Sequence, residues 1–303
     1  AVGQAYAFHL AQSGAAVTFL VKDKYLRTME HGLDIHVLAG PQRGRHHLTH
    51  LRITSELDEA MEGAWDQVWL CVSSPALHGD WLNTLCSKLG DATLVMLQPG
   101  MHDYERVTRL VPESQVVRGM ITLVSYKAPL EGDTGEPAMT WWFPPFSPTP
   151  FAGESTRVNE VVSPLKAGGL PAKHVRELDT QLRVGSALLM PLIAALEDAE
   201  WSLDQVSQPE RLKLAAKAAR QCLDISIPGR LNLVKALLTR PWLLHLALSI
   251  APRLTPFNLE AMLRFHFTKV GLQTRVMLQE YEDSATPQQA TDAINALRVR
   301  IGE

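Results

Sequence analysis

The chain has 303 residues, 46% of them hydrophobic, and a formal net charge of −3. These values are typical of a globular protein of about two domains. The small negative net charge gives no electrostatic support for nucleic-acid binding, which needs a strongly basic face. The three cysteines, Cys71, Cys86 and Cys222, lack the spacing of metal ligands and indicate a reducing, cytoplasmic compartment. The apolar helix expected over 242–251 is too short to cross a bilayer, so we expect no stable membrane insertion.

The chain opens with a predicted helix over 4–13, a glycine stop at Gly14 and a predicted strand over 17–21. This order is that of the second half of a dinucleotide-binding βαβ unit. Gly3 stands where the last glycine of the G-x-G-x-x-G fingerprint lets the helix pack close to the first strand. The first strand and the first two glycines are not in this sequence, which reads as an N-terminally truncated unit. We therefore expect the chain as written to bind a dinucleotide poorly or to fold poorly.

The residue after the strand at 17–21 bears on the choice of cofactor. An acid at this position binds the ribose hydroxyls of NAD, whereas a basic residue accepts the 2′-phosphate of NADP. Lys22 stands here, with Lys24 and Arg27 close behind, and it favours NADP because a charge-assisted hydrogen bond contributes about 1.5–3 kcal/mol. The alternative is that all three are solvated charges at the start of a helix.

Three further segments repeat the order of buried strand, tight turn and helix. The strands are expected over 65–72, 91–97 and 116–124, and the helices over 75–89 and 102–110. This repeat predicts a Rossmann-like, doubly wound parallel sheet, which binds ligands beyond the carboxyl ends of its strands. The cofactor-binding residues expected at that rim are Gly3, Lys22, Ser73, Ser74, Gln98, Gly100 and Met101.

Two other stretches of the first half have a simpler interpretation. His46, His47 and His50 are expected on a solvated edge strand rather than around a metal, because neighbours on a strand point to opposite faces and no Cys or Asp joins them. The aromatic residues 141–146 are expected to end a strand that extends the sheet antiparallel. They are expected to pack against the second domain rather than to cover a substrate.

Beyond Arg176 the pattern is helical. Helices are predicted over 178–201, with a kink at Pro191, and over 208–226, 231–238, 242–251, 259–281 and 287–299. We therefore predict an α/β NADP-binding domain over 1–176 and an all-α substrate and dimerisation domain over 177–303. The apolar helices 231–238 and 242–251 are expected in a packed core. A segment lying on a membrane surface is the alternative, because basic residues flank both helices.

Several segments, in this order and spacing, resemble the ketopantoate reductase (2-dehydropantoate 2-reductase) family over nearly the whole chain. Residues 1–3 are similar to the tail of its glycine fingerprint, and residues 97–101 are similar to its Leu-Gln-Asn-Gly-Met turn. The other similar segments are 20–22, 66–74, 119–122, 168–171 and 190–196. The resemblance implies an oxidoreductase that transfers a hydride between NADPH and a ketone or oxo acid in the cleft between its domains. We also expect a homodimer through the helical domain.

The chain departs from the family pattern where that pattern carries chemistry. Leu182 stands in place of the catalytic lysine, and Ser186 and Met190 in place of two substrate asparagines. Pro99 replaces an asparagine of the turn, and Ser73 replaces a lysine. A general acid contributes about 10²–10⁴ in rate, so these departures imply a substrate other than ketopantoate. The alternative is a catalytically inactive member that senses a cofactor or binds a partner.

Polar residues on the helix over 259–281 offer a replacement for the lost proton donor. At 100° per residue, His266, Lys269 and Gln273 fall on one face of that helix. Lys269 could donate a proton to a carbonyl, and His266 could tune it or act itself. Gln273, Ser186 and Arg183 are the substrate-binding candidates. The alternative for the first three is a polar stripe that faces solvent.

Overall fold

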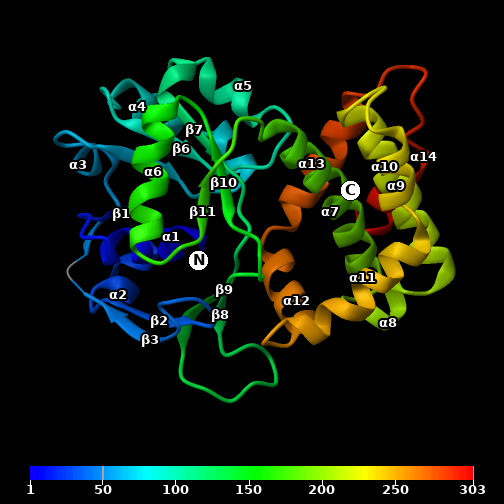
Figure 1. Ribbon diagram of the computed structural model, residues 1–303, viewed down its shortest axis with the longest axis horizontal. Coiled ribbons are helices and arrows are strands. Elements are labelled where there is room, and N and C mark those ends of the chain that lie inside the picture. The colour runs from blue at the N-terminus through cyan, green and yellow to red at the C-terminus, as the bar shows by residue number, and fades with distance from the viewer. Residues whose placement is uncertain (50, 303) are drawn as a thin grey trace. The chain divides into compact units, whose positions relative to one another are not determined.

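The computed structural model describes residues 1–49 and 51–302. It divides into two compact units: Ala1–Gln98 with His102–Leu178, and Pro99–Met101 with the residues from Asp179 onward. All described strands belong to the first unit, and the second is helical (Figure 1). The predicted fold class, an α/β domain followed by an all-α domain, is confirmed.

The strands of the described residues form three sheets. The largest has the order β11-β10-β7-β6-β5, in which β5 (Gln67–Leu70), β6 (Thr93–Met96) and β7 (Val116–Gly119) run parallel. β10 (Thr149–Ala152) is antiparallel to β7, and β11 (Ala172–His174) is parallel to β10. Every residue of β6 is buried, as expected of a parallel strand covered on both faces.

A second sheet has the order β3-β2-β9-β8. β2 (Leu33–Val37) pairs antiparallel with β3 (Gly44–Leu48) and parallel with β9 (Ala138–Trp142), which pairs antiparallel with β8 (Val124–Ala128). The prediction of one strand over 116–124 is therefore wrong, because β7 ends at Gly119 and β8 begins in another sheet. An apolar run does not show where a chain leaves one sheet for the next, since strands of both sheets bury side chains.

The aromatic stretch also differs from its prediction. It ends β9, in the second sheet, whereas β10 is the strand that extends the main sheet antiparallel. Trp141 and Phe143 are buried in the core of the first unit. Phe146, in the following loop, is fully exposed.

The third sheet pairs β1 (Thr18–Leu20) with β4 (Arg52–Thr54) in parallel. The helices of this unit are α1 (Val2–Gln12), α2 (Leu26–Met29), α3 (Leu57–Ala60), α4 (Trp81–Ser87), α5 (Asp103–Thr108) and α6 (Ser155–Ala167), with 3₁₀ turns at Asp23–Tyr25, Ser74–His78 and Glu113–Gln115. The helix predicted over 75–89 is thus a 3₁₀ turn followed by the short α4. The sequence analysis predicted no helix over the residues of α6.

Helix α1 lies in the core and is held by a buried histidine. Nδ1 of His9 donates to the carbonyl oxygen of Gly168 at 2.8 Å, and Nε1 of Trp141 donates to Nε2 of His9 at 3.3 Å. Both ring nitrogens are satisfied by the neutral imidazole. Burial lowers the pKa of His9 to about 4, against the smaller, opposite effect of the Gly168 hydrogen bond. Gly168 cannot be replaced at this contact, because a Cβ there would lie 1.7 Å from the carbonyl oxygen of His9.

The histidines of β3 point apart, as expected. Nδ1 of His47 lies 2.9 Å from Oδ1 of Asp34 on the exposed side, and this hydrogen bond raises the pKa of His47. His46 is within hydrogen-bond distance of the Gln42 carbonyl and packs against Phe8. His50 lies outside the described residues.

The second unit comprises α7 (Asp179–Asp198), α8 (Leu203–Val206), α9 (Pro209–Ser226), α10 (Asn232–Leu238), α11 (Pro241–Leu254), α12 (Leu259–Lys269), α13 (Gly271–Asp283) and α14 (Asp292–Arg300). Its core joins α7, α9, α13 and α14 through residues such as Ala194, Ala218, Leu278 and Ile294. Two predictions are corrected. The helix over 259–281 breaks at Val270 into α12 and α13, and the last helix begins at Asp292 rather than at 287.

The apolar helices α10 and α11 are not core helices, contrary to the prediction. Within them the structure buries only Lys235 of α10 and Leu248 of α11. No single described helix is long and apolar enough to cross a membrane. The pair α10 and α11, bent by 54° at the break between them, satisfies the length and composition required.

Candidate functional site

Helix α1 begins against the carboxyl end of β5. A Cβ at Gly3 would lie 3.1 Å from Cβ of Cys71, the residue that follows β5, so glycine allows the close approach of helix and strand end. No side chain caps the helix and no acidic residue lies in its first turn. Its positive end is therefore not offset by a carboxylate of its own, which suits an anionic ligand.

Lys22 lies two residues beyond the end of β1 and caps a 3₁₀ turn. It is exposed, and within the described part of the chain its ammonium group has no ion-pair partner. Lys24, by contrast, lies over the ring of Tyr25 with Nζ 5.0 Å from the ring centroid. Of these two lysines, Lys22 is the one whose charge no neighbouring ring engages.

Two serines follow β5. Ser73 is half-buried and caps a 3₁₀ turn that begins at Ser74. Ser74 is buried, and its Oγ has no hydrogen-bond partner among the described residues. An unsatisfied buried hydroxyl is costly, and a ligand group at this strand end could satisfy it.

Gln98, which follows β6, serves as a cross-link between strand ends. Its Nε2 donates to the carbonyl oxygens of Leu70 and Val72 at 2.7 and 2.8 Å, and its Oε1 accepts from the amide of Leu97. The side chain is buried and its amide is fully engaged. Gln98 therefore fixes the rim on which a ligand would lie, rather than reaching out to it.

The turn Pro99–Met101 belongs to the second unit by its contacts. The Met101 amide donates to Oε2 of Glu280 at 3.2 Å, and Oγ of Ser186 donates to the Pro99 carbonyl at 3.3 Å. The structure thus brings Ser186 together with the turn that contains Gly100. Glu280, on α13, was missed by sequence reasoning, because its partner is a backbone amide far away in the chain and no motif marks it.

The other substrate-binding candidate on α7 is engaged in an ion pair. Nε of Arg183 lies 2.6 Å from Oδ2 of Asp179, one turn earlier on the same helix. Leu182 and Met190, at the positions of the family's lysine and second asparagine, are both buried. This helix therefore offers Ser186 and a paired arginine, with apolar side chains where the family has charged and amide groups.

The catalytic candidates lie at the junction of α12 and α13. Lys269, the last residue of α12, is exposed, with Nζ 3.9 Å from the ring centroid of Phe265. His266 is half-buried, and burial, together with the charge of Lys269, lowers its pKa. Gln273 is on α13, beyond the break, and donates to the sulfur of Met277. The structure keeps His266 and Lys269 together, but the single helical face predicted for all three is wrong.

Comparison with known proteins adds to this geometry. Residues 1–131 match the family model of ketopantoate reductase PanE/ApbA. No curated protein matches the chain.

Solved structures resemble the chain over almost its whole length. A 2-dehydropantoate 2-reductase from Geobacter metallireducens GS-15 has a TM-score of 0.66 at 14% identity, over 99% of this chain and 96% of its own. The ternary structure of D-mandelate dehydrogenase with NADH and anilino(oxo)acetate has a TM-score of 0.75 at 12% identity, over 99% and 94%. A PanE/ApbA family ketopantoate reductase from Ralstonia eutropha JMP134 has a TM-score of 0.69 at 15% identity, over 98% and 92%. At these identities the structural likeness establishes the fold. Residues 1–131 are thus similar to the ketopantoate reductase (PanE/ApbA) family model, and over almost its whole length the chain has the fold of these solved structures.

Proposed function

We propose that this protein is an NADP-dependent oxidoreductase that interconverts a CH–OH and a C=O group on a small ketone or oxo acid other than ketopantoate. The observation that carries the proposal is the family match over residues 1–131, the part that holds Gly3 and the strand ends of β1, β5 and β6. The similar structures include 2-dehydropantoate 2-reductases and a D-mandelate dehydrogenase with NADH, which are oxidoreductases of this chemical class.

The residues of the first unit suit a nicotinamide dinucleotide. Gly3 leaves room at the positive end of α1, where an anionic diphosphate is favoured. The exposed ammonium of Lys22 suits the 2′-phosphate of NADP, and the buried hydroxyl of Ser74 lacks a partner that a ligand could supply. Ser73, Gly100 and Met101 complete the proposed cofactor-binding set, with Gln98 holding the rim in place. The bound cofactor would supply the hydride.

The second unit is proposed to bind the substrate and to move the proton. Lys269 is the proposed proton donor to the carbonyl oxygen, and the neutral His266 favoured by burial is its neighbour on the same helix. Ser186, Arg183 and Gln273 are proposed to orient the polar groups of the substrate. We propose that the domains 1–176 and 177–303 divide the work in this way, and that a homodimer forms through the helical domain.

A second function has an observation of its own. Leu182 is buried at the position where the family carries its catalytic lysine, so that lysine's chemistry is absent from α7. A protein that binds NADPH without turning over a substrate, as a cofactor sensor or partner-binding protein, would keep the first unit intact and tolerate this loss. Binding and turnover must therefore be measured separately.

The binding experiment titrates the protein with NADPH and with NADH, followed by nucleotide fluorescence. We expect NADPH to bind more tightly, and Lys22→Ala to weaken NADPH by about 10- to 100-fold while leaving NADH unchanged. Lys88→Ala is the matched control, because Lys88, directly after α4, is paired with Asp58 at 2.7 Å and is not among the proposed cofactor-binding residues. Absence of binding by either nucleotide, also in a chain extended by a first strand and the first two glycines of the fingerprint, would refute both functions.

The turnover experiment follows NADPH consumption with a panel of aliphatic and aromatic 2-oxo acids. We expect turnover of at least one, and a loss of about 10²–10⁴ in kcat for Lys269→Ala with partial recovery in Lys269→Arg. The exposed Lys213→Ala on α9 is the control. NADPH binding without turnover of any oxo acid would favour the sensor over the enzyme.

A further inference from the structure

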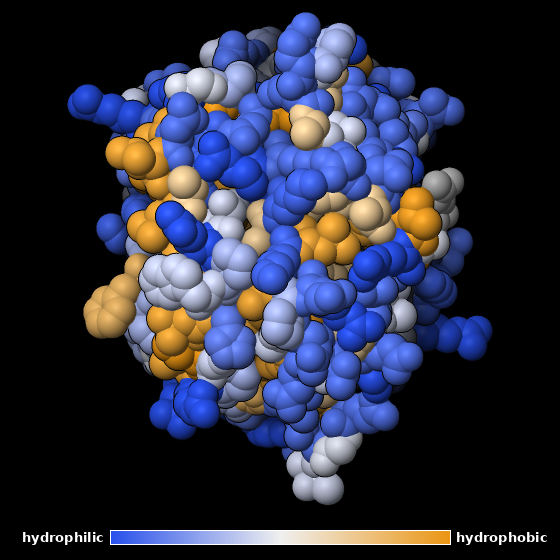
Figure 2. Space-filling model, turned by 90° about the vertical axis from the view of Figure 1, so that its right-hand side faces the viewer, coloured by the Kyte–Doolittle hydropathy of each residue, from blue (hydrophilic) through white to orange (hydrophobic). Residues whose placement is uncertain are grey.

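The exposed large apolar side chains of the second unit concentrate on α10 and α11. They are Leu231, Leu233, Val234 and Leu237 at the first helix, and Trp242, Leu246, Ile250 and Leu254 on the second, with exposures from 41% to 88%. We call this set the apolar face. Figure 2 shows apolar areas among hydrophilic ones on one face of the molecule. Large apolar side chains exposed together on neighbouring helices point to an interaction site.

The spacing within each helix places these residues in one stripe. Trp242, Leu246, Ile250 and Leu254 recur every fourth residue along α11, and successive members of such a row lie one above the other. In α10, Leu233 and Leu237 have the same spacing. Each helix thus presents apolar side chains that the rest of its own unit leaves exposed.

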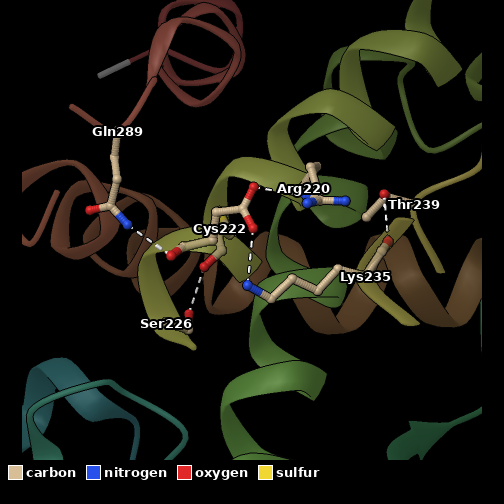
Figure 3. A network of polar contacts seen from close by, with 7 residues as sticks. Arg220, Cys222, Ser226, Lys235, Thr239 and Gln289 are labelled. Carbon is tan, nitrogen blue, oxygen red and sulfur yellow. Dashed lines mark hydrogen bonds and ion pairs between the residues drawn. The ribbon is translucent and has the colours of Figure 1, made fainter. Parts of the chain in front are cut away.

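The opposite side of α10 is tied down, which fixes the apolar face outward. Lys235 is buried, and its Nζ lies 3.0 Å from Oδ1 of Asp224 on α9, whose Oδ2 also receives Nε of Arg220 at 2.8 Å (Figure 3). Although partial burial acts to raise it, these two cations hold the pKa of Asp224 below its ordinary value. Gln289 binds the Asp224 carbonyl at 2.8 Å. With Lys235 turned inward, Leu233 and Leu237 cannot rotate into the core without breaking this pair.

Within the segment that carries the apolar face, the charged residues have one sign. Between Asp224 and Glu260 the sequence has no acidic residue, although the chain as a whole carries −3. Arg230, Arg240 and Arg253 are exposed there, and within the described residues none of the three has an acidic partner. Apolar side chains, a tryptophan and surrounding arginines are the features of a helix that lies in the interface of an anionic lipid layer.

We propose that α10 and α11 form a docking surface for an anionic lipid membrane, on which the helices lie without crossing it. Two observations favour this occupant and this depth. A symmetric contact with a second copy would set the arginines of both copies against each other with no carboxylate of the segment between them. A crossing would carry Arg240, at the bend between the helices, into the hydrocarbon, which is costly. The proposal is independent of the proposed activity, because no candidate site residue lies on either helix.

The test is co-sedimentation of the protein with vesicles of phosphatidylcholine alone and of phosphatidylcholine with phosphatidylserine. We expect binding to the anionic vesicles to exceed binding to the neutral ones by at least about tenfold and to fall as salt is raised. The double variant Leu233→Ser with Leu246→Ser should lose most of the binding, and Arg240→Gln with Arg253→Gln should lose the preference for anionic lipid. Leu272→Ser is the matched apolar control, because Leu272 is 65% exposed on α13, outside the apolar face. Lys213→Gln is the matched charge control.

Circular dichroism and the denaturation midpoint of each variant establish that it folds. Equal binding to both vesicle types, or unchanged binding by the double leucine variant, would overturn the proposal. A second outcome would also overturn it: the wild-type protein does not bind vesicles but self-associates in sedimentation velocity, and the leucine variants abolish this self-association. The apolar face would then be covered by a second copy.

Discussion

Helices α1 and α11 are both apolar, with 11 and 14 residues, yet they lie in opposite environments. Helix α1 buries five consecutive residues, Ala5 to His9, so it is covered on every side, whereas α11 buries only Leu248. Small residues and a satisfied histidine allow α1 to be enclosed by α6 and the sheets. Helix α11 carries bulky side chains in a stripe that nothing in its unit covers. Apolar composition therefore predicts a helix but not whether that helix is enclosed.

The largest effect is expected where the enclosure of α1 is tightest. Gly168→Ala places a methyl group 1.7 Å from the His9 carbonyl oxygen, which only a shift of backbone can relieve. We expect a loss of roughly 4 kcal/mol or more in the free energy of unfolding, measured by urea denaturation. Gly185→Ala in α7 is the control, because its Cβ meets nothing within 4 Å. A loss below about 1 kcal/mol would mean that α1 and α6 are not packed as described.

The second-largest effect is expected on the pH dependence of stability, through the buried His9 of α1. The pKa of His9 is about 4 in the folded protein against 6.5 for the free side chain, so between these values the unfolded state binds a proton that the folded state does not. Stability from this group is complete above pH 6.5 and is lost as the pH falls toward 4, by up to about 3 kcal/mol. Urea midpoints across this range should show the slope in the wild type and not in His9→Gln. His47→Gln, at the exposed surface, should keep it.

A smaller effect is expected at the buried cation that anchors α10. Lys235→Met removes one partner of Asp224, but Asp224 is partly exposed and keeps Arg220, so we expect a loss of about 1–3 kcal/mol. Lys217→Met breaks the exposed pair with Asp292 and should cost below about 1 kcal/mol. Thermal unfolding of the two variants side by side distinguishes them. Equal costs would show that Lys235 does not fix the orientation of α10.

The smallest effect is expected on the apolar face. Leu246→Ala should change the free energy of unfolding by less than about 0.5 kcal/mol, because its side chain is 46% exposed. Phe8→Ala, whose side chain in α1 is 1% exposed, should cost about 3–5 kcal/mol. The comparison is measured by chemical denaturation of both variants. A large cost at Leu246 would mean that α11 is packed in the protein after all.

Much of the architecture could be predicted from local pattern. The strands β5 and β6 follow from buried apolar runs, and α7 and α9 follow from helical periodicity. Gly3 was expected against a first strand that is not in this sequence, and it lies against Cys71 at the end of β5, where a Cβ would be only 3.1 Å away. The break at Val270 was missed although Gly271 directly follows it, because a single glycine is often tolerated within a helical pattern. The break separates Gln273 from the helix of His266 and Lys269.

The sequence by itself determined most of the helices and the strands β5 and β6, because these depend on neighbours within a few positions, and it supplied the proposal of which residues contact a dinucleotide. Tertiary structure alone decided three features: the engagement of Gln98 with two strand ends, the contact of Glu280 with the Met101 amide, and the outward apolar face of α10 and α11. Each depends on segments distant in the chain. The hydrogen bonds and burial that distinguish a ligand-binding side chain from a structural one, or a core helix from a docking surface, exist only when those segments meet.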